Sequence, residues 1–315
     1  MPLAFVFPGQ GSQSVGMLAS LSGLDPVVRA TFDEASAVLG YDLWHLVQEG
    51  PVERLNQTEC TQPALLAAGI ATLRLWAKLG GREPTAVSGH SLGEFTALVA
   101  ANALDFSTAV DIVKFRGKVM QEAVPAGTGL MAAILGLADA DVEAACREAS
   151  AQGGVVEAVN YNSVGQVVIA GQTAAVQRAM ELAKAKGAKR AMPLQVSVPS
   201  HSSLMQPAAE RLGKRLESVQ FRAPRIRYIS AVDGAVRADA AELRPLLVRQ
   251  LASPVRWPDT VRALVGTGIT HLIECGPGKV LTNLNKRVEG VTGVAFAAIE
   301  DAATLDAALA ATKGS

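Results

Sequence analysis

The chain has 315 residues, about half of them apolar and few of them aromatic, which suffices for one large domain or two modest ones. Basic and acidic residues number 29 each, so the net charge of zero gives no sign of a nucleic-acid-binding protein. Three scattered cysteines fit neither a disulfide framework nor a metal site. Since there is no basic signal-peptide start and no membrane-length apolar run, we expect a cytoplasmic protein with reduced thiols and no membrane contact.

Strand-like and helix-like runs alternate along the chain, and this alternation predicts an α/β fold. Short apolar strands are expected at residues 3–9 and 85–89, and helices at 62–80 and 91–104. The second strand and the second helix are separated by only one residue. A sharp strand-to-helix turn is therefore expected near residue 90.

Residues 128–197 follow a different order of elements. The expected elements are a strand at 128–137, a helix at 138–151 with Asp139 as its N-cap, strands at 155–162 and 166–172 joined by a turn at 163–165, a helix at 173–187 and a strand at 189–197. This β-α-β-β-α-β order is that of a ferredoxin-like unit. We expect it, as residues 127–197, to interrupt one larger α/β domain formed by residues 1–126 and 198–315, which resumes with a helical run at 198–219 and strands at 269–276 and 293–301.

The segment GHSLG at 89–93 places a serine between glycines, at the expected strand-to-helix turn. This pattern is typical of a nucleophile elbow, and it makes Ser91 a candidate nucleophile. A serine needs a base within hydrogen-bond reach, and His201 is the best placed because it follows a strand and precedes a helix. The same residues also fit an ordinary glycine-flanked turn and a helix-capping histidine. The other histidines are less suitable by position: His45 on a helix face, His90 beside the serine and His271 at a strand start.

A serine hydrolase of the α/β type would also need an acid between its serine and its histidine in chain order. The acidic residues between positions 91 and 201 do not lie in a convincing loop after a strand, and several fall in the inserted segment. The simple hydrolase interpretation therefore lacks its third residue.

Eight short segments carry a family resemblance that covers essentially the whole chain. They are FPGQGSQ at 7–13, QTECTQPAL at 57–65, GHSLGE at 89–94, FRG at 115–117, NYNSVGQVVIAG at 160–171, VPSH at 198–201, QLASPVRW at 250–257 and ECGPGKVL at 274–281. With these segments in this order, the chain resembles bacterial malonyl-CoA:acyl carrier protein transacylases, and more distantly the acyltransferase domains of fatty-acid and polyketide synthases. The resemblance implies a larger α/β-hydrolase-like domain with a parallel sheet, interrupted by the ferredoxin-like subdomain.

The resemblance also implies an acyl transfer in two halves. Ser91 would take malonyl from malonyl-CoA as an ester and pass it to the phosphopantetheine thiol of acyl carrier protein, with His201 as the base. A main-chain carbonyl, here that of Gln250, would orient the imidazole, so no triad acid would be needed. The backbone N–H groups of Gln10 and Leu92 would form the oxyanion hole.

Substrate selection is implied to rest on Arg116, whose guanidinium would hold the free carboxylate of malonyl through two parallel hydrogen bonds. Position on the helix alone leaves this side chain facing either the site or solvent. Gln62 and Asn162 match family segments near the cleft and are candidates for lining it. Ser200, just before the histidine, leaves selection against C2-substituted groups such as methylmalonyl open.

The expected partners are malonyl-CoA and acyl carrier protein in fatty-acid biosynthesis, with no metal or redox cofactor and a monomer as the default. A basic cluster formed by Lys184, Lys186, Lys189 and Arg190 is a candidate docking surface for the acidic carrier, or a solvated helix end. Three other functions stay open: a serine thioesterase or hydrolase, a malonyltransferase serving a polyketide or malonate decarboxylase carrier, and a non-catalytic carrier-binding protein.

Overall fold

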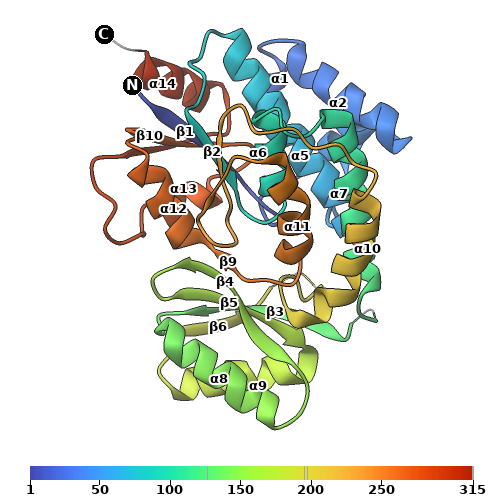
Figure 1. Cartoon of the computed structure of the whole chain (residues 1–315), viewed down its shortest axis with the longest axis vertical. Helices are drawn as coiled ribbons and strands as arrows, with labels where there is room; N and C mark the ends of the chain where they lie inside the picture. Colours follow the sequence, from blue (N-terminus) through green and yellow to red (C-terminus); the bar gives the residue numbers. More distant parts are fainter. Residues whose placement is uncertain (126, 195, 197, 314–315) are drawn as a thin grey trace.

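The computed structural model describes residues 1–125, 127–194, 196 and 198–313, and it divides into a larger and a smaller part (Figure 1). A six-stranded sheet runs through the larger part in the order β11-β10-β1-β2-β7-β8, with parallel neighbours except for the antiparallel pair β7-β8 at one edge. Its strands are β1 (Leu3–Phe7), β2 (Ala86–Gly89), β7 (Arg227–Ile229), β8 (Val236–Arg237), β10 (His271–Cys275) and β11 (Ala295–Ile299).

Strand β1 lies inside this sheet and is apolar along its whole length. All five of its residues are buried, because helices cover both faces of the parallel part of the sheet. Leu3, Phe5 and Phe7 join the core on one face, whereas Ala4 and Val6 join the core on the other. The continuous apolar run of β1 is thus the pattern expected for a strand with no solvent-facing side.

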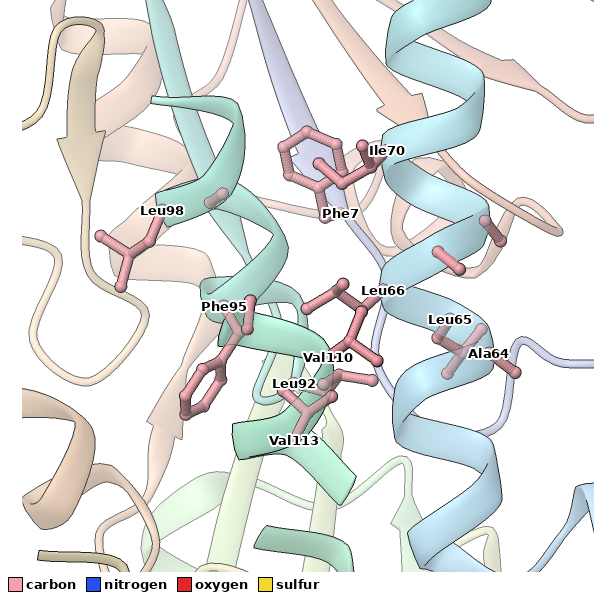
Figure 2. Close-up of a cluster of buried hydrophobic side chains, with 14 of the residues drawn as sticks. Phe7, Ala64, Leu65, Leu66, Ile70, Leu92, Phe95, Leu98, Val110 and Val113 are labelled. Carbon is pink, nitrogen blue, oxygen red and sulfur yellow. The ribbon is translucent and has the colours of Figure 1, made fainter. Parts of the chain in front are cut away.

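The helices around this sheet set the frame of the candidate site. Figure 2 shows Phe7 of β1, Leu66 of α5, Leu92 and Phe95 at the start of α6, and Val113 of α7 gathered in one apolar cluster. The helices are α1 (Ala19–Ser22), α2 (Val27–Leu39), α3 (Leu43–Glu49), α4 (Val52–Leu55), α5 (Thr58–Lys78), α6 (Gly93–Ala100), α7 (Phe106–Glu122), α10 (Gln206–Leu216) after the 3₁₀ turn Ser203–Met205, α11 (Ala240–Gln250), α12 (Trp257–Gly266), α13 (Val280–Asn285) and α14 (Ala302–Thr312).

A five-stranded sheet forms the smaller part in the order β6-β3-β5-β4-β9. The segment between residues 129 and 193 has the expected β-α-β-β-α-β order, and α8 and α9 cover one face of the sheet (Figure 1). Strand β9, which follows α11 in the chain, was not expected here, and it pairs in parallel with β4. The elements are β3 (Gly129–Leu135), α8 (Asp139–Ala151), β4 (Val156–Ser163), β5 (Gln166–Gln172), α9 (Thr173–Ala185), β6 (Arg190–Pro193) and β9 (Val255–Arg256).

Several element boundaries differ from the sequence-based expectations. Helix α5 begins at Thr58, four residues earlier than expected, with Pro63 inside it, because burial of nearly the whole helix outweighs one missing hydrogen bond. Helix α6 is shorter than expected and ends at Ala100, shortly before Asn102 adopts a left-handed φ of 56°. The N-cap expectation for Asp139 was wrong: Ala138 is the N-cap, and Asp139 lies in the first turn, where its charge favours the helix dipole.

The end of the last strand expected in the insert is only partly described. Strand β6 ends at Pro193, and positions 195 and 197 of the expected strand lie outside the described residues. The expected domain boundaries at 126–127 and 197–198 also include undescribed positions. Within the described ranges, no helix has both the length and the apolarity that a membrane crossing requires.

Candidate active site

Ser91 lies on the sharp turn between β2 and α6. Its φ of 53° is in the left-handed region, which is strained for a residue with a side chain. The turn is too tight for a side chain at its flanking glycines: a Cβ on Gly89 would lie 1.9 Å from the Gly93 carbonyl carbon, and one on Gly93 would lie 2.1 Å from the Phe7 carbonyl oxygen. The G-x-S-x-G spacing is therefore a packing requirement of this elbow.

His201 faces this serine from the loop before α10. Its Nε2 lies 2.7 Å from Ser91 Oγ, and its Nδ1 lies 2.9 Å from the main-chain oxygen of Gln250. Because a carbonyl oxygen can only accept, Nδ1 carries the proton and Nε2 is free to accept the serine hydroxyl. The structure thus brings together the two residues that the sequence analysis paired, with the expected carbonyl behind the ring.

The imidazole of His201 is buried, with 3% of the residue exposed. Burial, followed by the nearby positive charge of Arg116, lowers the pKa of His201 to about 3. The ring is therefore neutral at neutral pH, which is the state in which it can accept a proton. Like Ser91, this residue has a left-handed φ, here 65°, and its N–H donates to the Leu251 carbonyl oxygen at 3.1 Å.

Arg116 points from α7 into the same site, so the solvent-facing alternative does not hold. It is 1% exposed, and its Nη2 donates to Ser91 Oγ at 3.3 Å and to Gln250 Oε1 at 3.0 Å. Its Nη1 donates to Gln62 Oε1 at 2.9 Å. Burial lowers the pKa of Arg116 to about 10, and the charge of Glu94 opposes that shift. A buried cation with neutral partners thus lies beside the candidate nucleophile.

Of the two expected oxyanion-hole residues, one lies at this turn and the other on a loop packed against it. Leu92 follows Ser91 and is the N-cap of α6, where backbone N–H groups are free of helical partners. Gln10 follows β1 on a loop that closely approaches the elbow, since a Cβ on Gly9 would lie 2.6 Å from the His90 carbonyl oxygen. Both residues line the cavity at Ser91, and the FPGQG segment is thus part of the site.

A cavity of about 90 Å³ lies in front of the serine, between the two parts of the molecule. Polar and apolar side chains from both parts form its walls, which suits a short acyl chain with a charged end. Its lining residues are Gln10, Gln62, His90, Ser91, Leu92, Arg116, Met120, Met131, Asn160, Leu194, Val196, Ser200 and His201.

Comparison with known proteins places this chain in a family. A family model described as an acyl transferase domain matches residues 4–299. The chain belongs to the acyl transferase family. It is 55% identical over 306 residues to the malonyl CoA-acyl carrier protein transacylase of Salmonella typhimurium, covering 97% of this chain and 98% of that protein. The protein of the same name from Bacillus subtilis is 43% identical over 311 residues, or 99% and 97% of the two chains.

Solved structures agree with this family membership. The acyl carrier protein S-malonyltransferase of Vibrio cholerae superposes with a TM-score of 0.93 at 55% identity, covering 98% of this chain and 99% of that one. A malonyl-transacylase solved in complex with a type II PKS acyl-carrier protein gives a TM-score of 0.96 at 52% identity, with coverage of 99% and 100%. The arrangement of two sheets and surrounding helices is therefore shared with experimentally solved relatives.

Two asparagines on β4 of the acyl transferase take different places near the cavity. Asn162, a candidate lining residue, does not appear among the described lining residues, and its Oδ1 lies 3.0 Å from His90 Nε2. The β4–β5 ladder is irregular between Ala158 and Asn160 and again between Tyr161 and Ser163, and a bulge of this kind turns a side chain from its regular direction. Asn160 lines the cavity instead, and its buried Oδ1 has no hydrogen-bond partner among the described residues. The bulge is not visible in the sequence, which explains why Asn160 was missed.

Glu94 is a second residue of the acyl transferase site that the sequence analysis did not single out. It is fully buried on α6, and its Oε1 accepts from the Tyr228 hydroxyl at 2.7 Å and the Ala231 N–H at 2.8 Å. Its Oε2 accepts a hydrogen bond from Gln250 Nε2. Burial raises the pKa of Glu94, and these hydrogen bonds oppose the shift. A lone charged residue in a helix that otherwise holds only apolar residues and one threonine is the signal that could have identified it.

Proposed function

We propose that the chain transfers malonyl from malonyl-CoA to the phosphopantetheine thiol of acyl carrier protein, as a step of fatty-acid biosynthesis. The names of the relatives support this substrate and this acceptor. The single observation that carries the proposal is the buried guanidinium of Arg116, 3.3 Å from Ser91 Oγ. An acyl group on Ser91 with a free carboxylate at its far end is the substrate that this charge suits.

In the first half-reaction, His201 Nε2 takes the proton of Ser91 while Oγ attacks the thioester carbonyl carbon. The negative oxygen of the tetrahedral intermediate is stabilised by the N–H groups of Gln10 and Leu92. The intermediate collapses by breaking the carbon–sulfur bond, and the departing sulfur takes the proton from His201. Malonate is left as an ester on Ser91.

In the second half-reaction, the carrier's phosphopantetheine thiol gives its proton to His201 and attacks the ester carbonyl. Collapse breaks the bond to Ser91 Oγ, which regains its proton from the imidazole. A carbonyl behind the ring stabilises the imidazolium less than a carboxylate would. A less stabilised imidazolium is the stronger acid, which suits protonation of the departing Ser91 Oγ. In the first half-reaction the departing thiolate needs less help from an acid, because the thiol pKa is only about 8.5.

The identity of the carrier has a specific second candidate. One of the most similar solved relatives was captured with a type II PKS carrier, so a polyketide carrier is a further acceptor to test beside that of fatty-acid synthesis. A hydrolase would need water to reach the acyl ester in place of the thiol.

The test is intact-mass analysis of wild type and Arg116→Ala after mixing with malonyl-CoA or acetyl-CoA. We expect wild type to gain a malonyl adduct on Ser91 that either carrier, and not buffer alone, discharges. Arg116→Ala should form the malonyl ester roughly a hundredfold more slowly while losing far less acetyl transfer, because only malonyl offers a carboxylate. Discharge without carrier at the transfer rate would support a hydrolase, and equal losses for both thioesters would remove the selectivity role.

We also infer an α/β-hydrolase-like domain from residues 1–126 and 198–315 and a ferredoxin-like subdomain from 127–197. The mostly parallel larger sheet supports the first assignment. The smaller sheet supports the second, because its four strands from this segment lie in the order β6-β3-β5-β4 with antiparallel neighbours and both helices on one face. Strand β9 adds an edge from the larger domain.

A further inference from the structure

Gln250 contacts all three principal residues of the candidate site. Its main-chain oxygen orients the ring of His201, its Oε1 accepts from Arg116 Nη2 at 3.0 Å, and its Nε2 donates to the Ser91 carbonyl oxygen at 2.9 Å. The side chain is buried, so each end of its amide depends on these fixed partners. The orientation of this amide therefore bears on both the nucleophile and the cation.

Glu94 determines which way the Gln250 amide points. A carboxylate accepts and does not donate, so the Nε2 group of Gln250 turns toward Glu94 and the Oε1 turns toward Arg116. In the reverse orientation, the amide N–H₂ would face the N–H groups of Arg116 and its oxygen would face the carboxylate. Both contacts would be repulsive in a buried site.

We propose that Glu94 is a positioning residue for Arg116. Its negative charge favours the charged guanidinium from a distance, and the Gln250 amide, which bonds to both residues, leaves Arg116 with no carboxylate among its described partners until the substrate arrives. This inference rests on the proposed malonyl transfer. The described hydrogen-bond partners of Arg116 are neutral oxygens of Gln62, Gln250 and Ser91. An incoming carboxylate outcompetes such neutral acceptors, because charge-assisted hydrogen bonds are about twice as strong. A carboxylate bonded directly to Arg116 would instead occupy the fork that the substrate needs.

The contacts of Glu94 agree with a remote countercharge. Its two oxygens are filled by Tyr228, Ala231 and Gln250, and the described contacts include no direct ion pair between Glu94 and Arg116. These three hydrogen bonds direct the carboxylate away from the guanidinium. Substrate selectivity, and not serine reactivity alone, should depend on this residue.

The test compares acylation of Ser91 by malonyl-CoA and by acetyl-CoA in wild type, Glu94→Gln, Glu94→Asp and Tyr228→Phe. Glu94→Gln presents an N–H₂ group to Gln250 and removes the charge, so we expect the malonyl-to-acetyl rate ratio to fall at least tenfold. Glu94→Asp keeps the charge and should recover part of the ratio. Tyr228→Phe is the matched control, because it removes one hydrogen bond to Glu94 without changing its charge, and the ratio should stay within about twofold of wild type.

If a folded Glu94→Gln enzyme loses the same fraction of its acylation rate with malonyl-CoA and with acetyl-CoA, the proposal is overturned. A purely structural role would lower both rates together. In an Arg116→Ala background, Glu94→Gln should change the ratio no further, and a second tenfold fall would also overturn it. Should Glu94→Gln not fold, Glu94→Asp decides: a partial fall in the ratio supports the relay and an unchanged ratio contradicts it. A wild-type enzyme that forms no malonyl ester would instead refute the proposed function, so the two failures are distinct.

Discussion

At the residue scale, the candidate nucleophile and the candidate base are both held in strained backbone conformations. Ser91 and His201 are two of the few non-glycine residues with positive φ among the described residues. Both are tied to one short segment, because the His201 N–H donates to the Leu251 carbonyl and the Gln250 side chain donates to the Ser91 carbonyl. Strain of this kind persists where the surroundings over-determine it, and here one segment restrains both residues.

The buried state of His201 gives a prediction for the pH dependence of acylation. Because the pKa of the folded ring lies below its usual 6.5, the imidazole stays neutral as pH falls through that value. The acylation rate with acetyl-CoA should therefore stay level from about pH 8 to pH 5, and its acid limb should lie well below 6.5. The unfolded chain does take up the proton below 6.5, so this ring makes the fold less stable as pH falls. A half-maximal acylation rate near pH 6.5 would contradict this prediction.

At the element scale, the strand-turn-helix around Ser91 could be predicted because its requirement is local. Gly89 and Gly93 lie where the turn has no room for a side chain, and the G-x-S-x-G pattern therefore indicates this turn from the sequence alone. The start of α5 could not be predicted from the local sequence, because Pro63 disfavours a helix interior. The helix extends through this proline because its residues are buried against segments distant in sequence. The bulge at Asn162 and the pairing of β9 with β4 also depend on partners distant in sequence.

The elbow glycines can be tested with a matched pair of substitutions. Gly93→Ala would place a Cβ 2.1 Å from the Phe7 carbonyl oxygen, whereas Gly213→Ala in α10 would make only ordinary contacts with Val248, at 3.4 Å. We expect Gly93→Ala to lose at least about 2 kcal/mol of unfolding free energy and most of its acylation rate. Gly213→Ala should gain about 0.5–1 kcal/mol, since alanine is the better helix former. Denaturant unfolding with acylation measures both, and wild-type behaviour of Gly93→Ala would contradict the packing argument.

At the scale of the whole molecule, the order of the expected elements predicted an insertion, and the structure has the small sheet closing one side of the cavity. Met131, Asn160 and Leu194 come from that part and face Ser91 and Arg116 of the larger one. Most polar residues of the cavity could be predicted, because they lie in the segments that resemble the family. The apolar wall could not, because its side chains look like ordinary core residues until the two sheets are brought together.

The carrier-docking patch belongs to this scale and stays a prediction. Lys184, Lys186, Lys189 and Arg190 are all exposed at the end of α9 and the start of β6, and Lys186 has an ion-pair partner in Glu148, at 3.4 Å. Reversing Lys184 and Lys189 to glutamate should raise the KM for an acidic carrier severalfold without changing acylation by malonyl-CoA. Lys78→Glu, at the exposed end of α5, is the control. An unchanged KM for the carrier would exclude the patch.

The pairing of β9 with β4 has a consequence for how the enzyme can move. Val255 follows Gln250 by only a few residues, so the stretch of chain that orients the base is anchored to the small sheet soon afterwards. A displacement of the small sheet relative to the large one would therefore be transmitted through the residues between Gln250 and Val255 to the carbonyl that orients the imidazole. The spacing of the two sheets and the orientation of the candidate base are thus linked by one short stretch of chain.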